Sequence, residues 1–202
     1  VTDISTDRTN SVIPASGSVS FYLRLFNAEH SKAVPEDFTL MIRPVAQSWQ
    51  EGVGLDLEDY KDKTKGLPGA NWMSASNTAA WTASAGLTGG SYLTGTSDPT
   101  FKRTFSTGLE DLEINVTPLI EHWIAGTISN NGFGVHLTSS QEAYFSSSTG
   151  LNSGSVLNNT GGAETSYYTK RFFARGTQYF FSQPLIEARW NSGVKDDRGD
   201  FM

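Results

Sequence analysis

The stretch Leu112–Leu137, LEINVTPLIEHWIAGTISNNGFGVHL, combines the signals that decide the fold. Its first residues, LEINV, alternate apolar and polar side chains, which is the period of a half-buried strand. The pair Thr117–Pro118 is typical of a helix start, and Gly126 is typical of a helix end. The last five residues, FGVHL, alternate again after the turn SNNG. The segment therefore predicts a strand, one short helix and a second strand.

The apolar residues of this helix fall on one face, since they recur at helical spacing. They are Leu119, Ile120, Trp123 and Ile124. His122 lies off that face, next to Trp123. We therefore expect Trp123 in the core and His122 outside it.

Further strands are predicted on both sides of this segment, because alternation recurs along the chain. The side chains expected to face inward are Val19, Phe21, Leu23, Leu25, Phe38, Leu40, Ile42, Ile186, Ala188 and Trp190. Pro44 marks the end of one strand, and the stretches TFKRTFSTGLEDLEINVT, TKRFFARG and YFFSQPLIEARWN also read as strand. Many short strands with a single short helix predict an all-β fold, an antiparallel β-sandwich (jelly roll) with long end loops.

Three segments are expected along the chain. Residues 1–18 form an N-terminal lead-in, 19–190 the β-sandwich domain, and 191–202 an extended C-terminal linker or contact segment. The chain begins at Val1 and stops abruptly in KDDRGDFM, so we expect a fragment or a processed product.

Composition excludes several classes of function. The chain has 202 residues, enough for one full-sized domain with a single core. A formal net charge of −6 offers no large basic field for nucleic acid or for an anionic membrane. Cysteine is absent, which excludes disulfides, thiolate metal sites and thiol catalysis. We expect neither a nucleic-acid nor a membrane partner.

The three histidines give no support to catalysis. His30, His122 and His136 show no metal-ligand spacing, and no G-x-S-x-G elbow is present. His136 alternates with apolar neighbours and is expected to point away from the core. We interpret all three as surface or boundary residues, with no catalytic residue, no cofactor and no enzyme activity expected.

One acidic loop is a weak candidate for calcium. Its carboxylates lie within the stretch DLEDYKD and are Asp56, Glu58, Asp59 and Asp62. Oxygen-rich loops of this kind bind calcium, but this one lacks the glycine and the terminal glutamate of an EF-hand loop. The alternative is a solvated loop. A second acidic group, Glu110, Asp111 and Glu113, is interpreted as solubilising charge at a sheet edge.

Aromatic and basic residues in the loops are the remaining candidates for contact. Trp72, Trp81 and Tyr92 belong to a region rich in glycine and serine. Their rings would stack on a sugar or insert into a neighbouring subunit; the alternative is that they pin the loops to the sandwich. Arg171 and Arg175, with Lys170, form a small basic cluster beside two phenylalanines. Its alternative is ordinary outward-facing charge.

Three motifs together resemble the DNRLRE-type domains, which are also grouped with carbohydrate-binding modules. They are LEINVTPLIEHWIAGTISNNGFGVHL, VAQSWQEG and YYTKRFFARG…QPLIEARW, and they cover residues 19–190. The resemblance implies a non-catalytic jelly-roll β-sandwich used as an accessory module, with glycan binding in some members. Asn115 stands where the family's triplet has Asp, a change expected to weaken any role of that position in holding the helix.

The C-terminal stretch KRFFARGTQYFFSQPLIEARWNSGVKDDRGDF is also similar to virion structural proteins of marine tailed bacteriophages. That resemblance implies a module of the neck, tail or capsid surface whose partners are other copies or other structural proteins of the particle. The expected location is then the virion. The alternative is a carbohydrate-binding module on a polysaccharide-acting or cell-surface protein, outside a bacterial cell, with polysaccharide as its ligand.

Overall fold

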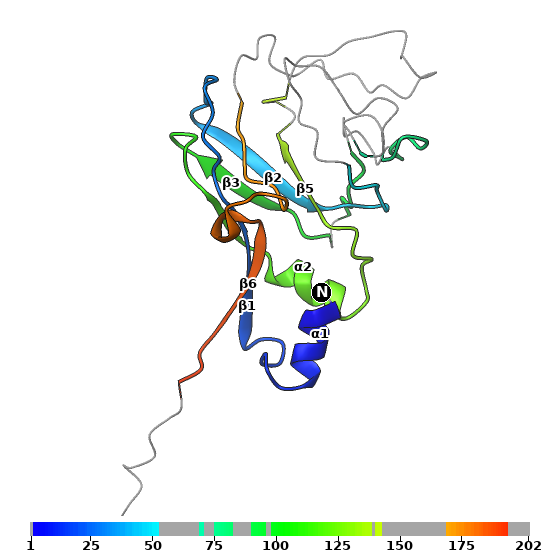
Figure 1. Ribbon diagram of the computed structural model, residues 1–202. Helices are drawn as coiled ribbons and strands as arrows, with labels where there is room; N and C mark the ends of the chain where they lie inside the picture. Colours follow the sequence, from blue (N-terminus) through cyan, green and yellow to red (C-terminus); the bar gives the residue numbers. More distant parts are fainter. Residues whose placement is uncertain are drawn as a thin grey trace, which may run out of the picture.

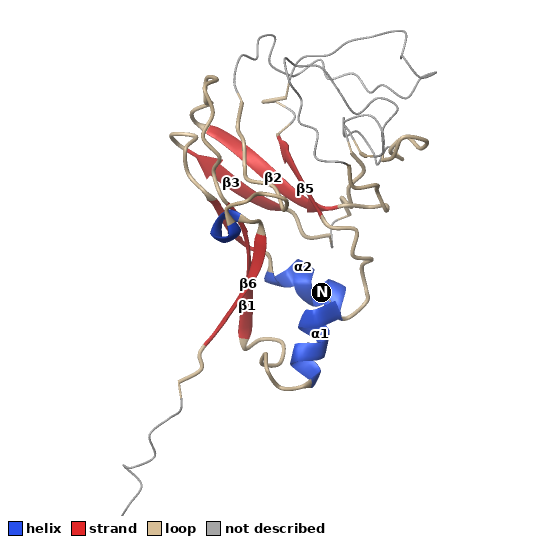
Figure 2. Ribbon diagram, in the orientation of Figure 1, coloured by secondary structure: helices blue, strands red, loops and turns tan. Residues whose placement is uncertain are grey.

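The computed structural model describes residues 2–52, 69–70, 75–82, 90–95, 98–138, 140–142 and 169–193. Within them the chain forms two antiparallel three-stranded sheets, which confirms the predicted all-β sandwich (Figure 1). One sheet has the order β4-β1-β6 and the other the order β3-β2-β5. Figure 2 shows these two groups of strands with the helices at one end of them.

The first sheet is centred on β1, Val19–Leu25. Strand β4, Leu112–Asn115, lies on one side of β1, and β6, Leu185–Trp190, lies on the other. Leu23 of β1 stands opposite a residue of each neighbour, Ile114 in β4 and Ile186 in β6. All inward residues predicted for β1 therefore share a face with those of its two partners, as the alternation requires.

The second sheet is centred on β2, Phe38–Pro44, which ends at the predicted proline. Its neighbours are β3, Phe101–Phe105, and β5, Phe133–Leu137. Strands β3 and β4 follow one another in sequence but belong to different sheets. The sequence pattern predicted a single return to strand over residues 100–117. That prediction is wrong, because the chain crosses from one sheet to the other at residues 106–111.

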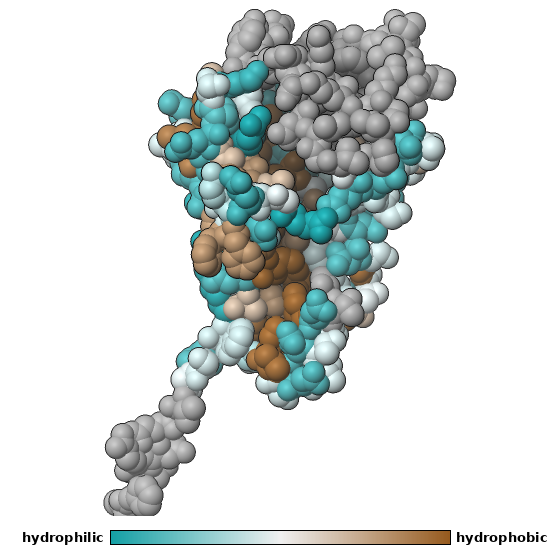
Figure 3. Space-filling view, in the orientation of Figure 1, coloured by the Kyte–Doolittle hydropathy of each residue, from teal (hydrophilic) through white to brown (hydrophobic). Residues whose placement is uncertain are grey.

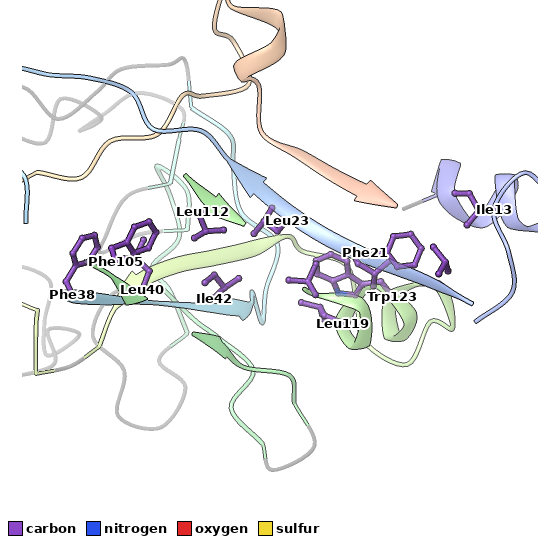
Figure 4. Packing of buried hydrophobic residues seen from close by; sticks show 13 residues of the cluster. Ile13, Phe21, Leu23, Phe38, Leu40, Ile42, Phe105, Leu112, Leu119 and Trp123 are labelled. Carbon is purple, nitrogen blue, oxygen red and sulfur yellow. The ribbon is translucent and has the colours of Figure 1, made fainter. Parts of the chain in front are cut away.

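The core lies between the sheets and continues into the helix at their end (Figure 4). Its buried members come from both sheets, from helix α2 (Thr117–Ile124) with the residue before it, and from the segment before β1. They are Ile13, Val19, Phe21, Leu23, Phe38, Leu40, Ile42, Phe105, Leu112, Val116, Leu119, Ile120 and Trp123. Phe38 and Phe105 stack with ring centroids 4.9 Å apart. The inward residues predicted for β1 and β2 are thus confirmed as buried except for Leu25, which is half-buried, whereas Trp190 of β6 is 40% exposed.

Helix α2, Thr117–Ile124, is the helix that the sequence predicted. Leu119, Ile120 and Trp123 are buried, and the Trp123 ring meets Phe133 edge-on at 4.8 Å. Gly126 ends the helix with φ of +70°, a left-handed conformation that favours glycine. The predicted orientation of the helix is confirmed.

The start of α2 differs from the prediction in one respect. Thr117 is the first helical residue and does not cap the helix through its side chain. Its Oγ1 instead accepts a hydrogen bond from the backbone N–H of Phe21 at 2.8 Å, which joins β1 to α2. Asn115 Oδ1 accepts the N–H of Thr117 at 3.0 Å, so asparagine at this position does hold the helix start.

A second helix, α1, spans Thr2–Thr9 within the expected lead-in segment and was not predicted. Its contact with α2 is a two-pronged ion pair, in which Arg8 donates to both carboxylate oxygens of Glu121 at 2.7 Å. The guanidinium Nε also donates to the carbonyl of Pro14 at 3.2 Å. This pair joins residues far apart in sequence, which is why local periodicity gave no sign of the helix. In the described parts of the chain, no helix is both long and apolar enough to cross a membrane.

Replacing Thr117 by valine tests the link between β1 and α2. Valine keeps the shape of threonine but leaves the buried N–H of Phe21 without its acceptor, and we expect a loss of about 1–3 kcal/mol in the free energy of unfolding. Chemical denaturation measures it. Thr100→Val, at an exposed threonine on the surface, is the control and should change stability by less than about 0.5 kcal/mol. Equal effects of the two substitutions would contradict this role of Thr117.

Candidate functional site

Only some of the candidate binding residues predicted from the sequence lie in the described part of the chain. Trp72 and the calcium candidates Asp56, Glu58, Asp59 and Asp62 lie outside the described residues. Trp81 is half-buried. Within the described ranges, no group of three or more histidine, aspartate and glutamate side chains is arranged to hold a metal ion.

Tyr92 is buried, so at this position the alternative holds: the ring pins its segment to the sandwich and is not open to a sugar or to a neighbouring subunit. Only 7% of the residue is exposed, because it lies flat against the outer face of the second sheet. Its ring stacks on His136 with centroids 4.7 Å apart. It also lies so close over Gly134 that a Cβ atom on that residue would overlap the ring. The backbone of Tyr92 forms a bridge to Val45, which fixes the segment beside β2.

His136 points away from the inter-sheet core, as predicted, because it stands opposite Met41 rather than the inward residues of β2. It is nevertheless 7% exposed, so the interpretation as a surface residue is wrong. Nδ1 lies 2.7 Å from the carbonyl oxygen of Leu137 and 3.8 Å from Oε1 of Glu142. Tyr92 covers the ring from outside. The alternation along β5 predicted correctly which face of the sheet His136 lies on. It could not predict that another segment of the chain covers that face.

The chemistry of His136 follows from this burial. Burial lowers the pKa of His136, and the nearby Arg43 acts in the same direction, while the bond to Leu137 opposes them. The ring is therefore neutral at pH 7. Since a carbonyl oxygen only accepts, Nδ1 carries the proton and Nε2 is left as an acceptor. Among the described residues, Nε2 has no hydrogen-bond partner. His136 is thus a packed polar residue under an aromatic ring.

His30 and His122 agree with the prediction of boundary positions. His122 is half-buried, off the apolar face of α2, and its Nδ1 lies 2.8 Å from Oγ1 of Thr127. His30 is half-buried in a loop, where its Nδ1 accepts the N–H of Lys32 at 3.2 Å.

The expected basic cluster is not brought together. Lys170 turns inward and donates to Asn27 Oδ1 at 2.7 Å and to the carbonyls of Gly108 and Glu110 at 2.8 Å. Arg171 is exposed. Arg175 pairs with Glu51 at 2.7 Å on the surface. The three cations therefore do not form one surface. Lys170 binds groups within the chain, whereas Arg171 and Arg175 are outward-facing charges.

The second acidic group is more than solubilising charge. Glu110 accepts the backbone N–H groups of Ser106 and Thr107 at 2.9 Å. These bonds, that of Thr107 foremost, hold the pKa of Glu110 at about 2. Asp111 accepts the N–H of Asn27 at 2.7 Å. Each carboxylate fastens a turn at the place where the chain passes between the sheets.

Glu113, the third member of that group, belongs to an ion-pair network on the outer face of the first sheet. Arg189 of β6 donates to both its oxygens at 2.9 and 3.0 Å and also pairs with Glu187 at 2.9 Å. The Arg189 guanidinium lies 4.1 Å from the centre of the Tyr22 ring. Arg24 of β1 completes the network with 3.1 Å to Glu187 and 3.4 Å to Glu113. The charged residues of the three strands are thus matched with opposite charges across the sheet.

The two most exposed large apolar side chains of the described residues, Phe180 and Phe181, lie in a turn that was predicted to be part of a strand. Tyr179, Phe180 and Phe181 are 57%, 74% and 88% exposed, and we call these three residues the aromatic turn. A 3₁₀ turn, η1, spans Phe180–Ser182, and strand β6 begins only at Leu185. Three consecutive aromatic residues have no alternation, and this was the signal that should have separated them from the strand.

The aromatic turn is the tip of a loop. Both ends of this loop pair with the same side of β1 and of the residues that follow it. Before it, Phe172 forms a bridge to Asn27, just beyond β1. After it, Leu185 stands opposite Arg24 of β1. The chain therefore leaves the sheet after residue 173 and returns to it at residue 185. A loop held at both ends presents its tip in a defined position.

Local bonds fix the conformation of this loop. Ser182 donates its N–H to the carbonyl of Tyr179 at 2.9 Å, and Thr177 donates to Ala174 at 3.1 Å. The Tyr179 ring meets Phe173 edge-on at 5.6 Å. Figure 3 shows, on the face of the molecule seen in that view, a band of apolar surface that runs from the region of β6 toward α1. The turn is thus an ordered and strongly apolar projection.

Trp49 is a further exposed aromatic residue and was not among the candidates predicted from the sequence. It is 46% exposed, and its indole N–H donates to the carbonyl of Asn131 at 2.7 Å. Its place in the motif VAQSWQEG was the available signal. The bond fixes the orientation of a ring whose surface is partly open to solvent.

Comparison of the chain with models of protein families, with curated proteins and with solved structures found no match.

Substituting Gly134 by alanine tests the packing of Tyr92 on the outer face of the second sheet. The added Cβ would overlap the ring and displace it from His136, and we expect a loss of about 1–3 kcal/mol in the free energy of unfolding. In a Tyr92→Ala background the same substitution should cost less than about 1 kcal/mol, because the ring is gone. Denaturant titrations of the four proteins measure this coupling.

Gly176→Ala is the control for this cycle, since a Cβ there meets nothing within 4 Å. It should leave stability within about 0.5 kcal/mol of the parent. A cost of Gly134→Ala that is the same with and without the Tyr92 ring would contradict the described contact.

Proposed function

We propose that the chain is a non-catalytic structural module of a tailed bacteriophage particle and works through protein–protein contacts. The observation that carries this proposal is the aromatic turn. Phe180 and Phe181 carry no polar atom in their side chains, yet they are 74% and 88% exposed. Aromatic side chains that project in this way are typical anchors of protein interfaces.

The order of the turn supports the proposal. Its ends are held by β1, and the Tyr179 ring packs on Phe173. Burying these rings against a partner would cost little conformational entropy, because the chain already holds them in place. The turn also lies inside the stretch that resembles virion structural proteins, KRFFARGTQYFFSQPLIEARW.

The hydrogen bonds that charged residues make within the chain also support a contact function. Arg8, Lys170 and Arg189 are all engaged in bonds within the chain. These cations are satisfied within the chain, whereas the side chains of Phe180 and Phe181 remain largely exposed. A rigid sandwich that offers an apolar projection fits a spacer or joint between other proteins.

The double substitution Phe180→Ser/Phe181→Ser tests the proposal in the particle. We expect the variant to fold normally, because both rings are exposed, but to enter particles about tenfold less efficiently or worse. The measurement is quantitative mass spectrometry of purified particles from cells that express each version of the full chain. Leu109→Ser, at a leucine that is 60% exposed on another turn, is the matched control and should enter normally.

Absence of the parent chain from purified particles, despite its presence in the lysate, would overturn the proposal. The alternative, a carbohydrate-binding module, is favoured by one observation: the fixed and half-open ring of Trp49. It would replace the first proposal if the purified chain bound polysaccharide and Trp49→Ala abolished that binding.

A further inference from the structure

We infer that β6 is a self-association edge, at which two copies of this chain pair their β6 strands antiparallel about a two-fold axis at Ala188. The inference deepens the proposed function, since it names a second copy as one contact partner. It concerns the edge of β6 and not the aromatic turn, so the two proposals can fail separately.

The free edge of β6 provides the backbone groups for this pairing. Among the described strands, β6 is hydrogen-bonded to β1 and lies at the end of its sheet (Figure 1). At its outer edge, backbone N–H and C=O groups point outward at alternate residues, as at any sheet edge. A second antiparallel strand would form hydrogen bonds with these N–H and C=O groups, whichever residues of β6 carry them. Two such strands would join the sheets of two copies into one.

The sequence of β6 is complementary to itself when it is reversed. Ile186, Glu187, Ala188, Arg189 and Trp190 read as apolar, acidic, small, basic and apolar. Antiparallel pairing about Ala188 places Glu187 opposite Arg189 of the partner subunit, and Arg189 opposite the partner's Glu187. Opposite charges at directly opposed positions favour a strand pair. The alanine on the axis meets the partner's Ala188 without a clash.

The charged residues of β6 retain capacity for such bonds. Arg189 makes four hydrogen bonds, two to Glu113 and two to Glu187. A guanidinium has about five N–H donors, so one remains. The side chains of Glu187 and Arg189 are 34% and 38% exposed. Both are therefore open to a partner while they keep their bonds within the chain.

Apolar side chains at the two ends of β6 add to the pairing. Leu185 is 38% exposed and Trp190 is 40% exposed. The register sets Trp190 opposite the partner's Ile186, an aromatic and β-branched pair of the kind that stabilises antiparallel sheets. Trp190 belongs to the strand that, among the described strands, lies at the end of its sheet. Pairing would cover it.

None of the three other described edge strands has this property, and β5 has five residues with no pair of opposite charges. Strand β3 carries Lys102 and Arg103, so pairing it with its own copy would bring like charges together. Strand β4 has four residues, and its one charge is Glu113. Strand β6 has six residues, which makes it the longest of the described edge strands, and its two charges are opposite. The choice of β6 thus follows from charge and length together.

A cysteine at position 188 tests the register directly, because the chain has none of its own. Directly opposed residues in an antiparallel pair have Cα atoms about 4.5 or 5.5 Å apart, within the roughly 4.4–6.8 Å that a disulfide spans. We expect Ala188→Cys to form a covalent dimer under mild oxidation, seen on a non-reducing gel. Leu109→Cys, exposed on a distant turn, should remain monomeric on that gel.

Charge reversal provides a second test that does not depend on the cysteine. Glu187→Arg alone and Arg189→Glu alone each bring like charges together, and we expect each to raise the dissociation constant of the dimer about tenfold or more. Mixing the two variants restores opposite charges at both positions and should give a heterodimer. Sedimentation equilibrium measures all three samples. Glu29→Arg, at an exposed residue away from the edge, is the control and should dimerise like the parent.

The inference is overturned if the parent chain is a monomer at every concentration up to about 1 mM, the weak end of specific association. It is also overturned if the parent is a dimer but Ala188→Cys does not cross-link and the mixed charge variants do not associate. Loss of particle entry in the aromatic-turn variant with an intact β6 cross-link would leave this inference standing. A cross-linked dimer from a chain that is absent from particles would sink the proposed function alone.

Discussion

The burial of α2 at one end of the apolar layer is the constraint on which the rest of the sandwich depends. Val116, Leu119 and Ile120 have no exposed surface, and Trp123 has 7%. Burying a large apolar side chain contributes about 1.5–3 kcal/mol, so this short helix closes the core at a place that six short strands leave open. The backbone of Phe21 binds both the N–H of Val116 and the hydroxyl of Thr117. Strand β1 is thereby fixed to α2 at the middle of its sheet, and β4 and β6 are aligned on it.

Several charged residues of the described chain join segments that are distant in sequence. Arg8 and Glu121 join the two helices, Lys170 holds the segment before the aromatic turn to the turn at 108–110, and Arg189 connects β6 with β4. A charge in such a role is satisfied within the molecule. The apolar rings of the aromatic turn stand out because no comparable role inside the chain explains them. This contrast, more than any single contact, favours a function in protein association.

The elements that could be predicted from the sequence are those whose own residues show a regular spacing of apolar side chains. Strands β1 and β2 and helix α2 follow from alternation and helical spacing, because each buries one face against a single core. The polar helix α1 could not be found in this way, since the Arg8–Glu121 pair that holds it spans more than a hundred residues. The aromatic turn was assigned to a strand because aromatic residues favour strands in general.

The burial of side chains on the outer face of the second sheet could not be predicted from the sequence either. Tyr92 lies more than forty residues from His136 in the chain, and only the folded structure brings their rings together. Lys170 was grouped with its sequence neighbours, but the carbonyls that it binds belong to a turn about sixty residues earlier. The inward residues of the core could therefore be predicted, whereas the candidate contact surface depended on how distant loops fold over the sheets.

The exposure of the aromatic turn in free and assembled protein is the most direct measure of a contact function. Hydroxyl-radical footprinting reports the solvent access of aromatic side chains, and it can be applied to the isolated chain and to intact particles. We expect strong oxidation of Tyr179, Phe180 and Phe181 in the isolated chain, where they are 57%, 74% and 88% exposed, and protection of all three in the particle. Leu109, 60% exposed on another turn, should be labelled equally in both states. Equal oxidation of the aromatic turn in the two samples would contradict the claim that this chain works through these side chains.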